Sequence, residues 1–188
     1  MKYDAQEYVD AFHQEGKYPK IHDNIFDVCK QFIPTDVNVM DLGACTGLLS
    51  MRLIQQGVAR KVVGLEPNKK SLSRAVKHPD ITYYNVGVTG ETVPRMRSVF
   101  HNYGIQAIVA RRVFPEIVEH AGVNVLKTFA RIASECEVDL IILEGRVETK
   151  RATSMLSAAD TEVKAISQYY EQVFTHKNVR VMKRREAK

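Results

Sequence analysis

Acidic residues and glycines stand at the ends of two predicted strands, in a pattern that could bind a nucleoside. Residues 39–47 read V-M-D-L-G-A-C-T-G, with Asp41 near the end of a strand and Gly43 and Gly47 in the loop that follows. Glu66 stands near the end of the next strand, in V-G-L-E-P-N. Glycine permits positive φ and close backbone approach, and a carboxylate at the tip of the following strand can accept hydrogen bonds from both ribose hydroxyls. The spacing therefore predicts a crevice for a nucleoside cofactor.

The charge of this loop favours one nucleoside cofactor over another. The dinucleotide fingerprint G-x-G-x-x-G needs its middle glycine so that the backbone can touch a pyrophosphate, and another residue fills that place here. Asp41 would also repel a diphosphate, whereas it would attract the ammonium and sulfonium groups of S-adenosylmethionine. The loop therefore favours S-adenosylmethionine over NAD.

Helical and extended segments alternate along the chain. Strands are predicted at residues 37–42, 61–65, 81–86, 105–110, 138–143 and 178–182. Helices are predicted at residues 4–15, 21–32, 48–56, 71–77, 91–103, 123–136 and 161–174. This alternation predicts an α/β fold with a doubly wound, mostly parallel sheet and helices on both faces. The length of 188 residues fits one domain, in which helices within residues 1–36 cover the crevice and residues 37–188 form the cofactor-binding core.

The first motif of the class I S-adenosylmethionine-dependent methyltransferases is matched by Asp41, Gly43 and Gly47, and the sequence resembles this family over roughly residues 37–143. The resemblance implies a Rossmann-like sheet with one antiparallel strand, in which Glu66 holds the adenosine ribose and the loop cradles the methionine part. The family usually ends in a strand hairpin. Because only one strand is predicted after Phe174, we expect the sheet to be one strand short.

The chain departs from the family pattern at two places. Many members have a glycine where Cys45 stands, and many have an acid after the third strand, where this chain has Asn85, Val86 and Gly87. The adenine contacts are therefore less firmly indicated than the ribose contact. The residues expected to bind the cofactor are Asp41, Gly43, Ala44, Cys45, Gly47, Glu66, Pro67, Val86, Gly87 and Ala110.

The end of the fourth strand normally faces the transferred methyl group in this family. Here it reads I-V-A-R-R-V-F-P-E-I, without the D-P-P-Y or N-P-P-Y pattern of enzymes that methylate amino groups of bases, and we predict no catalytic metal. Arg111 and Arg112 would place positive charge beside an acceptor phosphate or carboxylate, and Glu116 is the nearest candidate base. Alternatively, the arginines form a structural ion pair with Glu116 or Glu144, and Glu116 only accepts hydrogen bonds from backbone N–H groups at the start of a helix.

Two residues before the core, Tyr18 and His22, have a position that suits a lid over the cofactor. A packed aromatic side chain and a solvated histidine are the simpler interpretation, because only position favours a functional role.

The amino-acid composition favours an anionic partner and a reducing compartment. A net charge of +5 and a basic tail of Lys183, Arg184, Arg185 and Lys188 favour an anionic partner such as RNA, although a solvated basic surface is the alternative. The three cysteines form no C-x-x-C pair, which suits a reducing compartment. Since no apolar run is long enough to span a bilayer, we expect a cytoplasmic protein.

The sequence thus favours a methyltransferase that uses S-adenosylmethionine and acts on an anionic acceptor, either RNA or a small anionic metabolite, with help from a protein partner as one option. Two alternatives stay open. One is a noncatalytic S-adenosylmethionine-binding module or partner subunit, and the other is an enzyme that consumes the cofactor without a methyl acceptor.

Overall fold

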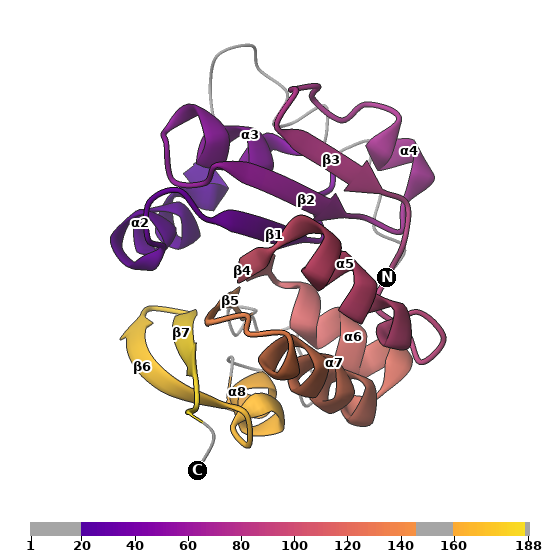
Figure 1. The fold of residues 1–188 in the computed structure, drawn as a ribbon, viewed down its shortest axis with the longest axis vertical. Coiled ribbons are helices and arrows are strands. Elements are labelled where there is room, and N and C mark those ends of the chain that lie inside the picture. The colour runs from indigo at the N-terminus through magenta and orange to yellow at the C-terminus, as the bar shows by residue number, and fades with distance from the viewer. Residues whose placement is uncertain (1–19, 146–159, 187–188) are drawn as a thin grey trace, which may run out of the picture.

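A seven-stranded sheet runs through the middle of the structure (Figure 1). The computed structural model describes residues 20–145 and 160–186. The strands are β1 (Asn38–Leu42), β2 (Lys61–Leu65), β3 (Ile81–Tyr84), β4 (Ile105–Arg111), β5 (Leu140–Glu144), β6 (Tyr170–His176) and β7 (Val179–Arg184). They lie in the order β3-β2-β1-β4-β5-β7-β6, with β1 to β5 parallel and β7 antiparallel to both β5 and β6. The predicted doubly wound, mostly parallel sheet is confirmed.

Helices cover both faces of this sheet (Figure 1). They are η1 (Lys20–His22), α2 (Asp23–Phe32), α3 (Leu48–Gln55), α4 (Lys69–Leu72), η2 (Val93–Arg95), α5 (Met96–Tyr103), α6 (Val113–Ala121), α7 (Val123–Glu135) and α8 (Asp160–Ile166). Successive strand residues point to opposite faces, so Val39 packs in the core with α2 and α3, whereas Met40 packs in the core with α5 to α8. The two hydrophobic cores fix the sheet between the helix layers.

The middle residues of β4 and β5 are apolar because both faces of the sheet are covered there. In β4, Ala107 to Ala110 are fully buried, and in β5, Ile141 and Ile142 are as well. Aromatic rings fill the larger core, where Phe129 lies edge-on to Phe100 with ring centroids 5.8 Å apart. No helix in the described parts of the chain is long and apolar enough to cross a membrane.

The expectation that the sheet is one strand short is wrong. The helix predicted at residues 161–174 ends at Ile166, and residues 170–176 form β6, which pairs with β7 in an antiparallel hairpin. Two interactions explain the strand: the fully buried Tyr170 donates a hydrogen bond to the carbonyl of Val138 at 2.8 Å, and Phe174 packs on Phe32 with centroids 4.7 Å apart. Aromatic and β-branched residues in this stretch favour a strand.

Two helices also differ from the prediction. Residues 113–121 form α6, which the predicted helix ranges do not include, and Glu116 lies in its first turn, where the alternative interpretation puts a helix entry. The helix predicted at 71–77 is the short α4, because the Asn68 side chain caps its first turn and Val76 N donates to Thr46 O rather than continuing the helix. The helix predicted at 4–15 and the start of the N-terminal cover lie outside the described residues.

Candidate functional site

The predicted cofactor loop lies at the point where the order of strands reverses. From β1 the chain proceeds outward through β2 to β3, and then returns to β4 on the other side of β1. Ligands of open α/β sheets bind at the carboxyl ends of the strands beside such a switch point. Ala110 near the end of β4 is paired with Leu42 at the end of β1, so this expected cofactor-binding residue lies beside the start of the loop at Gly43.

The loop after β1 needs its two glycines. Gly43 and Gly47 have φ of 73° and 74°, a region that favours glycine. A Cβ at Gly43 would collide with the side chain of Val113, and a Cβ at Gly47 would lie 2.7 Å from Cζ of Tyr83 and closer still to its hydroxyl. The predicted glycines are therefore required both by conformation and by close neighbours.

Glu66 is tied to this loop by its own carboxylate. Oε2 accepts a hydrogen bond from Cys45 N at 2.9 Å, and Oε1 accepts one from Asn68 N at 2.8 Å. Burial raises the pKa of this carboxyl, and the two backbone donors oppose the shift. An ionised carboxylate has about four acceptor positions, so acceptor capacity remains for the hydroxyls of a ribose.

The loops expected around adenine also come together. The Asn85 side chain donates to the carbonyls of Glu66 and Pro67, each at 2.9 Å. A Cβ added at Gly87 would lie 3.3 Å from Cβ of Pro67. The structure thus brings Pro67 and Gly87 side by side, with Val86 between Asn85 and Gly87 in the chain.

Asp41 is a buried carboxyl beneath the loop. Its side chain is only 2% exposed, and Oδ2 accepts a hydrogen bond from Ser50 Oγ at 2.5 Å. Burial raises the pKa of Asp41 to about 6, Ser50 opposes the shift, and the negative charge of Glu66 adds to it. The Tyr83 hydroxyl lies close enough to Asp41 for that charge, after burial, to raise the tyrosine pKa. A cationic ligand beside Asp41 would stabilise its ionised form.

Sequence reasoning missed Ser50 and Tyr83. Ser50 is a fully buried polar residue on α3, and its position on the apolar side of that helix is the one available signal. Tyr83 comes from β3 and fills the space that Gly47 and Gly64 leave open, which is a contact between segments far apart in the chain.

We expect the Asp41→Asn variant to change how stability depends on pH. The Asp41 pKa is about 6 in the folded chain against an ordinary 3.8, so ionisation of this carboxyl destabilises the fold as pH rises between these values. Relative to wild type, the variant should gain about 3 kcal/mol in free energy of unfolding from about pH 4 to pH 7. Urea unfolding at a series of pH values measures this gain.

The matched control is Asp36→Asn, at a carboxyl whose side chain is 77% exposed. It should leave the pH profile of wild type unchanged. Parallel profiles for Asp41→Asn and wild type would show that Asp41 does not have a raised pKa.

At the other side of the switch point, both arginines share one buried carboxylate. Arg111 Nε lies 3.3 Å from Glu144 Oε2, and Arg112 Nε lies 3.2 Å from Glu144 Oε1. The Glu144 side chain is 3% exposed, and the pairing follows from the register of β4 against β5, which sets Arg111 opposite Glu144. The ion pair with Glu144 considered from the sequence is therefore formed, and two guanidinium groups face one carboxylate.

One hydrogen-bond donor of the Arg111 guanidinium is not paired within the described residues. Its Nε also donates to Ile21 O at 3.2 Å, while its Nη2 is buried without a hydrogen-bond partner in the described residues. Glu116 lies instead on α6 with its side chain 47% exposed and pairs with His120 at 3.3 Å.

The solvated alternative for His22 is wrong, because His22 is 5% exposed. Burial, followed by the charges of Arg111 and Arg52, lowers its pKa to about 3, so the imidazole is neutral. Through Ile21 and His22 the start of the described chain reaches the end of β4, whereas Tyr18 lies outside the described residues.

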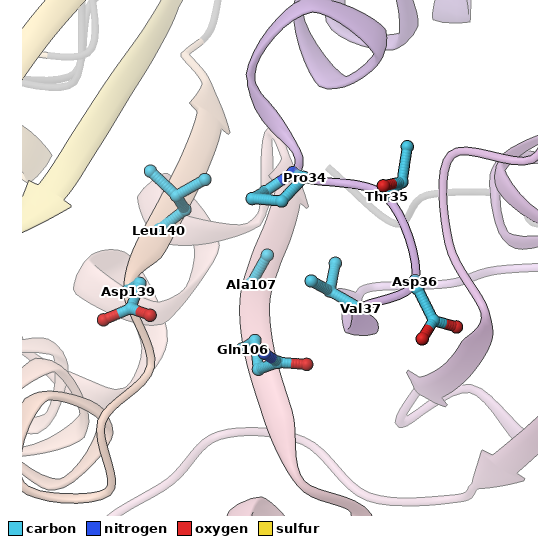
Figure 2. A pocket seen from close by; sticks show the side chains of 8 residues that line it. All are labelled: Pro34, Thr35, Asp36, Val37, Gln106, Ala107, Asp139 and Leu140. Atoms are coloured by element: carbon cyan, nitrogen blue, oxygen red, sulfur yellow. The ribbon is translucent and has the colours of Figure 1, made fainter.

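Two further features lie away from the expected cofactor site. A hollow of about 300 Å³ lies at the amino ends of β1, β4 and β5, which is the opposite edge of the sheet. Figure 2 shows the side chains that line it. It is lined by Pro34, Thr35, Asp36, Val37, Gln106, Ala107, Asp139 and Leu140. On α6, ligand atoms of Glu116, Glu119 and His120 lie within 4.8 Å of one another, but all three residues are exposed. The absence of a catalytic metal stays a prediction.

Comparisons with known proteins support the architecture. No protein family and no curated protein sequence matches the chain. Among solved structures, a putative methyltransferase from an antibiotic biosynthesis pathway of Anabaena variabilis is similar over 78% of this chain, with a TM-score of 0.54 and 15% identity. The bifunctional kinase-methyltransferase WbdD is similar over 95% of it, with a TM-score of 0.58 and 18% identity. The methyltransferase domain of bacterial CtHen1 is similar over 86%, with a TM-score of 0.57 and 16% identity.

The lengths of these proteins differ. The chain spans 60% of the Anabaena protein and 39% of WbdD, but 96% of the CtHen1 domain. At such low identity the similarity establishes the fold. With its seven strands in the order β3-β2-β1-β4-β5-β7-β6, the chain has the Rossmann-like α/β fold of the class I S-adenosylmethionine-dependent methyltransferases.

Proposed function

We propose that the chain is an S-adenosylmethionine-dependent methyltransferase that acts on an anionic acceptor, either RNA or a small anionic metabolite. The observation that carries this proposal is the junction of the two acid-bearing strand ends, where Cys45 N donates to Glu66 Oε2 at 2.9 Å. This hydrogen bond holds the carboxylate that would bind the ribose against the loop after β1. The buried acid beneath this loop, Asp41, favours a cation. A diphosphate would meet two carboxyls instead, which argues against NAD.

When bound, S-adenosylmethionine would supply its methyl group to the acceptor nucleophile by direct displacement at the sulfonium. The chain's own residues then need mainly to align two ligands. Glu66 would accept hydrogen bonds from the ribose, and Asp41 would favour the positive end of the methionine part. Gly43 and Gly47 keep the loop free of side chains, so a ligand can approach its backbone.

The acceptor anion would bind at Arg111. A buried donor without a partner costs about 1–3 kcal/mol, and an anionic group at Arg111 Nη2 would remove that cost. Because Glu144 offers one negative charge to two guanidinium groups, the cluster stays positive. Arg112, with its side chain 38% exposed, would add attraction at the rim. Glu116 remains the proposed base for an acceptor that must lose a proton.

Calorimetric titration with S-adenosylmethionine, its demethylated product and NAD tests the proposal. We expect the first two to bind and NAD not to bind. Binding of neither would refute a cofactor site in this chain. Product analysis with RNA and small anionic acceptors then follows the methyl group. Cofactor binding without any turnover would favour the noncatalytic module, and cofactor loss without acceptor would favour the cofactor-consuming enzyme.

A cytoplasmic location remains part of the proposal. Cys29, Cys45 and Cys136 are all free, as expected in a reducing compartment. Assistance from a protein partner is proposed only for the case in which the isolated chain binds cofactor and does not turn over.

A further inference from the structure

Exposed lysines gather on the short segment that follows Glu66. Lys69 and Lys70 lie on α4 and Lys77 follows it, and all three are exposed. None of the three forms an ion pair within residues 20–145 and 160–186. Two acids lie nearby in the chain: Glu66 accepts hydrogen bonds from the backbone N–H groups of Cys45 and Asn68, and Asp80 lies 3.7 Å from the imidazole of His78. We call Lys69, Lys70 and Lys77 the α4 lysine surface.

This surface is attached to the cofactor loop at both of its ends. Before α4, the Glu66 carboxylate accepts hydrogen bonds from Asn68 N at 2.8 Å and from Cys45 N in the loop at 2.9 Å. After α4, Val76 N donates to Thr46 O at 3.0 Å. The segment that bears the three lysines is therefore held at the carboxyl edge of the sheet, next to the expected cofactor site.

The basic tail lies elsewhere. Lys183 on β7 is paired with Leu140, the first residue of β5, so the tail leaves the sheet at the edge opposite the crevice. In Figure 1, α4 lies at the upper right and β7 at the lower left. Arg184 also pairs with Asp139 at 2.9 Å, and Arg185 pairs with Glu171 at 3.6 Å. The described part of the tail, Lys183 to Arg185, thus lies at the sheet edge opposite the expected cofactor site and is partly neutralised, whereas Lys188 lies outside the described residues.

The chemistry of the surface fits a phosphate backbone better than a membrane. Peripheral membrane segments combine basic residues with a buried apolar face. Among the described residues, the exposed large hydrophobic side chains are Tyr84, Val123 and Val173, and none lies on this segment. Lysines without apolar neighbours gain affinity mainly from counterion release on phosphates.

We propose that the α4 lysine surface contacts the phosphates of a single-stranded RNA whose acceptor group enters the crevice. This inference rests on the proposed function and names RNA as the class of its anionic acceptor. The strand is single because a base or ribose must leave a helix to enter a crevice between loops.

The test is fluorescence anisotropy with a labelled single-stranded RNA of about 16 nucleotides over a series of salt concentrations. The triple variant Lys69→Gln, Lys70→Gln, Lys77→Gln should bind more weakly. The slope of log affinity against log salt should fall in magnitude by about 2, since each phosphate contact on a single strand contributes about 0.7. The matched control, Lys183→Gln, Arg184→Gln, Arg185→Gln, removes the same charge from the tail and should bind like wild type.

Replacement of the three α4 lysines by arginine keeps the charge and should keep the salt slope. The proposal is overturned if the tail variant loses as much affinity as the α4 variant, if the α4 variant binds like wild type, or if wild type binds anionic lipid vesicles and not RNA. Calorimetry with S-adenosylmethionine on the same proteins separates the two proposals. RNA binding through the lysines without cofactor binding would refute the methyltransferase, whereas cofactor binding without RNA binding would refute the RNA surface.

Discussion

Replacement of Gly47 by alanine is expected to abolish binding of S-adenosylmethionine, whereas the same replacement at Gly57 should leave it unchanged. The two positions are matched in backbone conformation, with φ of 74° and 66°, so alanine strains both by about 1–2 kcal/mol. They differ in the space that is available to an added Cβ. A new Cβ at Gly47 would collide with the Tyr83 ring, but nothing lies within 4 Å of one at Gly57. Only the first replacement must therefore distort the loop.

Tyr83 cannot easily move away from that collision. Its ring packs beside Gly64, where an added Cβ would lie 2.6 Å from Cδ1 of the tyrosine. We therefore expect Gly47→Ala to lower the free energy of unfolding by about 3 kcal/mol, from backbone strain and overpacking together. Urea unfolding and cofactor calorimetry on both variants measure the two effects.

A double variant isolates the cause. Tyr83→Ala removes the ring, so Gly47→Ala should cost less in that background and the two changes should be non-additive. Equal cofactor affinity in the Gly47→Ala and Gly57→Ala variants would contradict the site, because the loop would then tolerate a side chain at its closest point.

The parts of the fold that sequence patterns predicted are those specified locally. Within the strands predicted at 105–110 and 138–143, the buried residues 107–110 and 141–143 are all apolar and form the middle of β4 and β5, since both faces of these strands are covered. The loop with Gly43 and Gly47 was predictable for a similar reason. Positive φ is a local demand that the sequence meets with glycine.

The errors arose where distant contacts decide the local structure. The stretch at 170–176 continues a helical pattern, yet burial of Tyr170 against Val138 makes it a strand. The predicted helix ranges do not include residues 113–121, which form α6; Pro115 stands in the first turn of this helix, where proline is tolerated because its missing N–H has no partner in any case. At 170–176 a distant contact overrode the local helical preference, and at 113–121 the helix was missed in the sequence.

The side-chain pairs of the candidate site were least accessible from sequence. Arg111 was equally compatible with Glu116 and Glu144, and only the register of β4 against β5 sets it opposite Glu144. Contacts such as that of Tyr83 with Gly47 join β3 to the loop after β1. Such pairings are properties of the assembled sheet, because no spacing within one segment encodes them.

The second large effect is expected at Glu66. Each of its two carboxylate oxygens accepts one backbone N–H, from Cys45 and from Asn68. A glutamine has one acceptor oxygen, so in Glu66→Gln one of these N–H groups would face an amide N–H instead. The variant should lose that hydrogen bond and the charged acceptor for the ribose hydroxyls. Because hydrogen bonds to charged groups contribute about 1.5–3 kcal/mol each, cofactor affinity should fall by about 100-fold or more.

Loss of affinity alone would not distinguish a ribose contact from a distorted loop, so the decisive comparison uses two ligands. The demethylated product and its analogue without both ribose hydroxyls should differ strongly in affinity for wild type. If Glu66 accepts hydrogen bonds from these hydroxyls, the difference should nearly vanish in Glu66→Gln, and it should persist in the control Glu137→Gln, at an exposed carboxyl. If instead both ligands weaken by the same factor, Glu66 only supports the loop, and the nucleoside must be held by other groups.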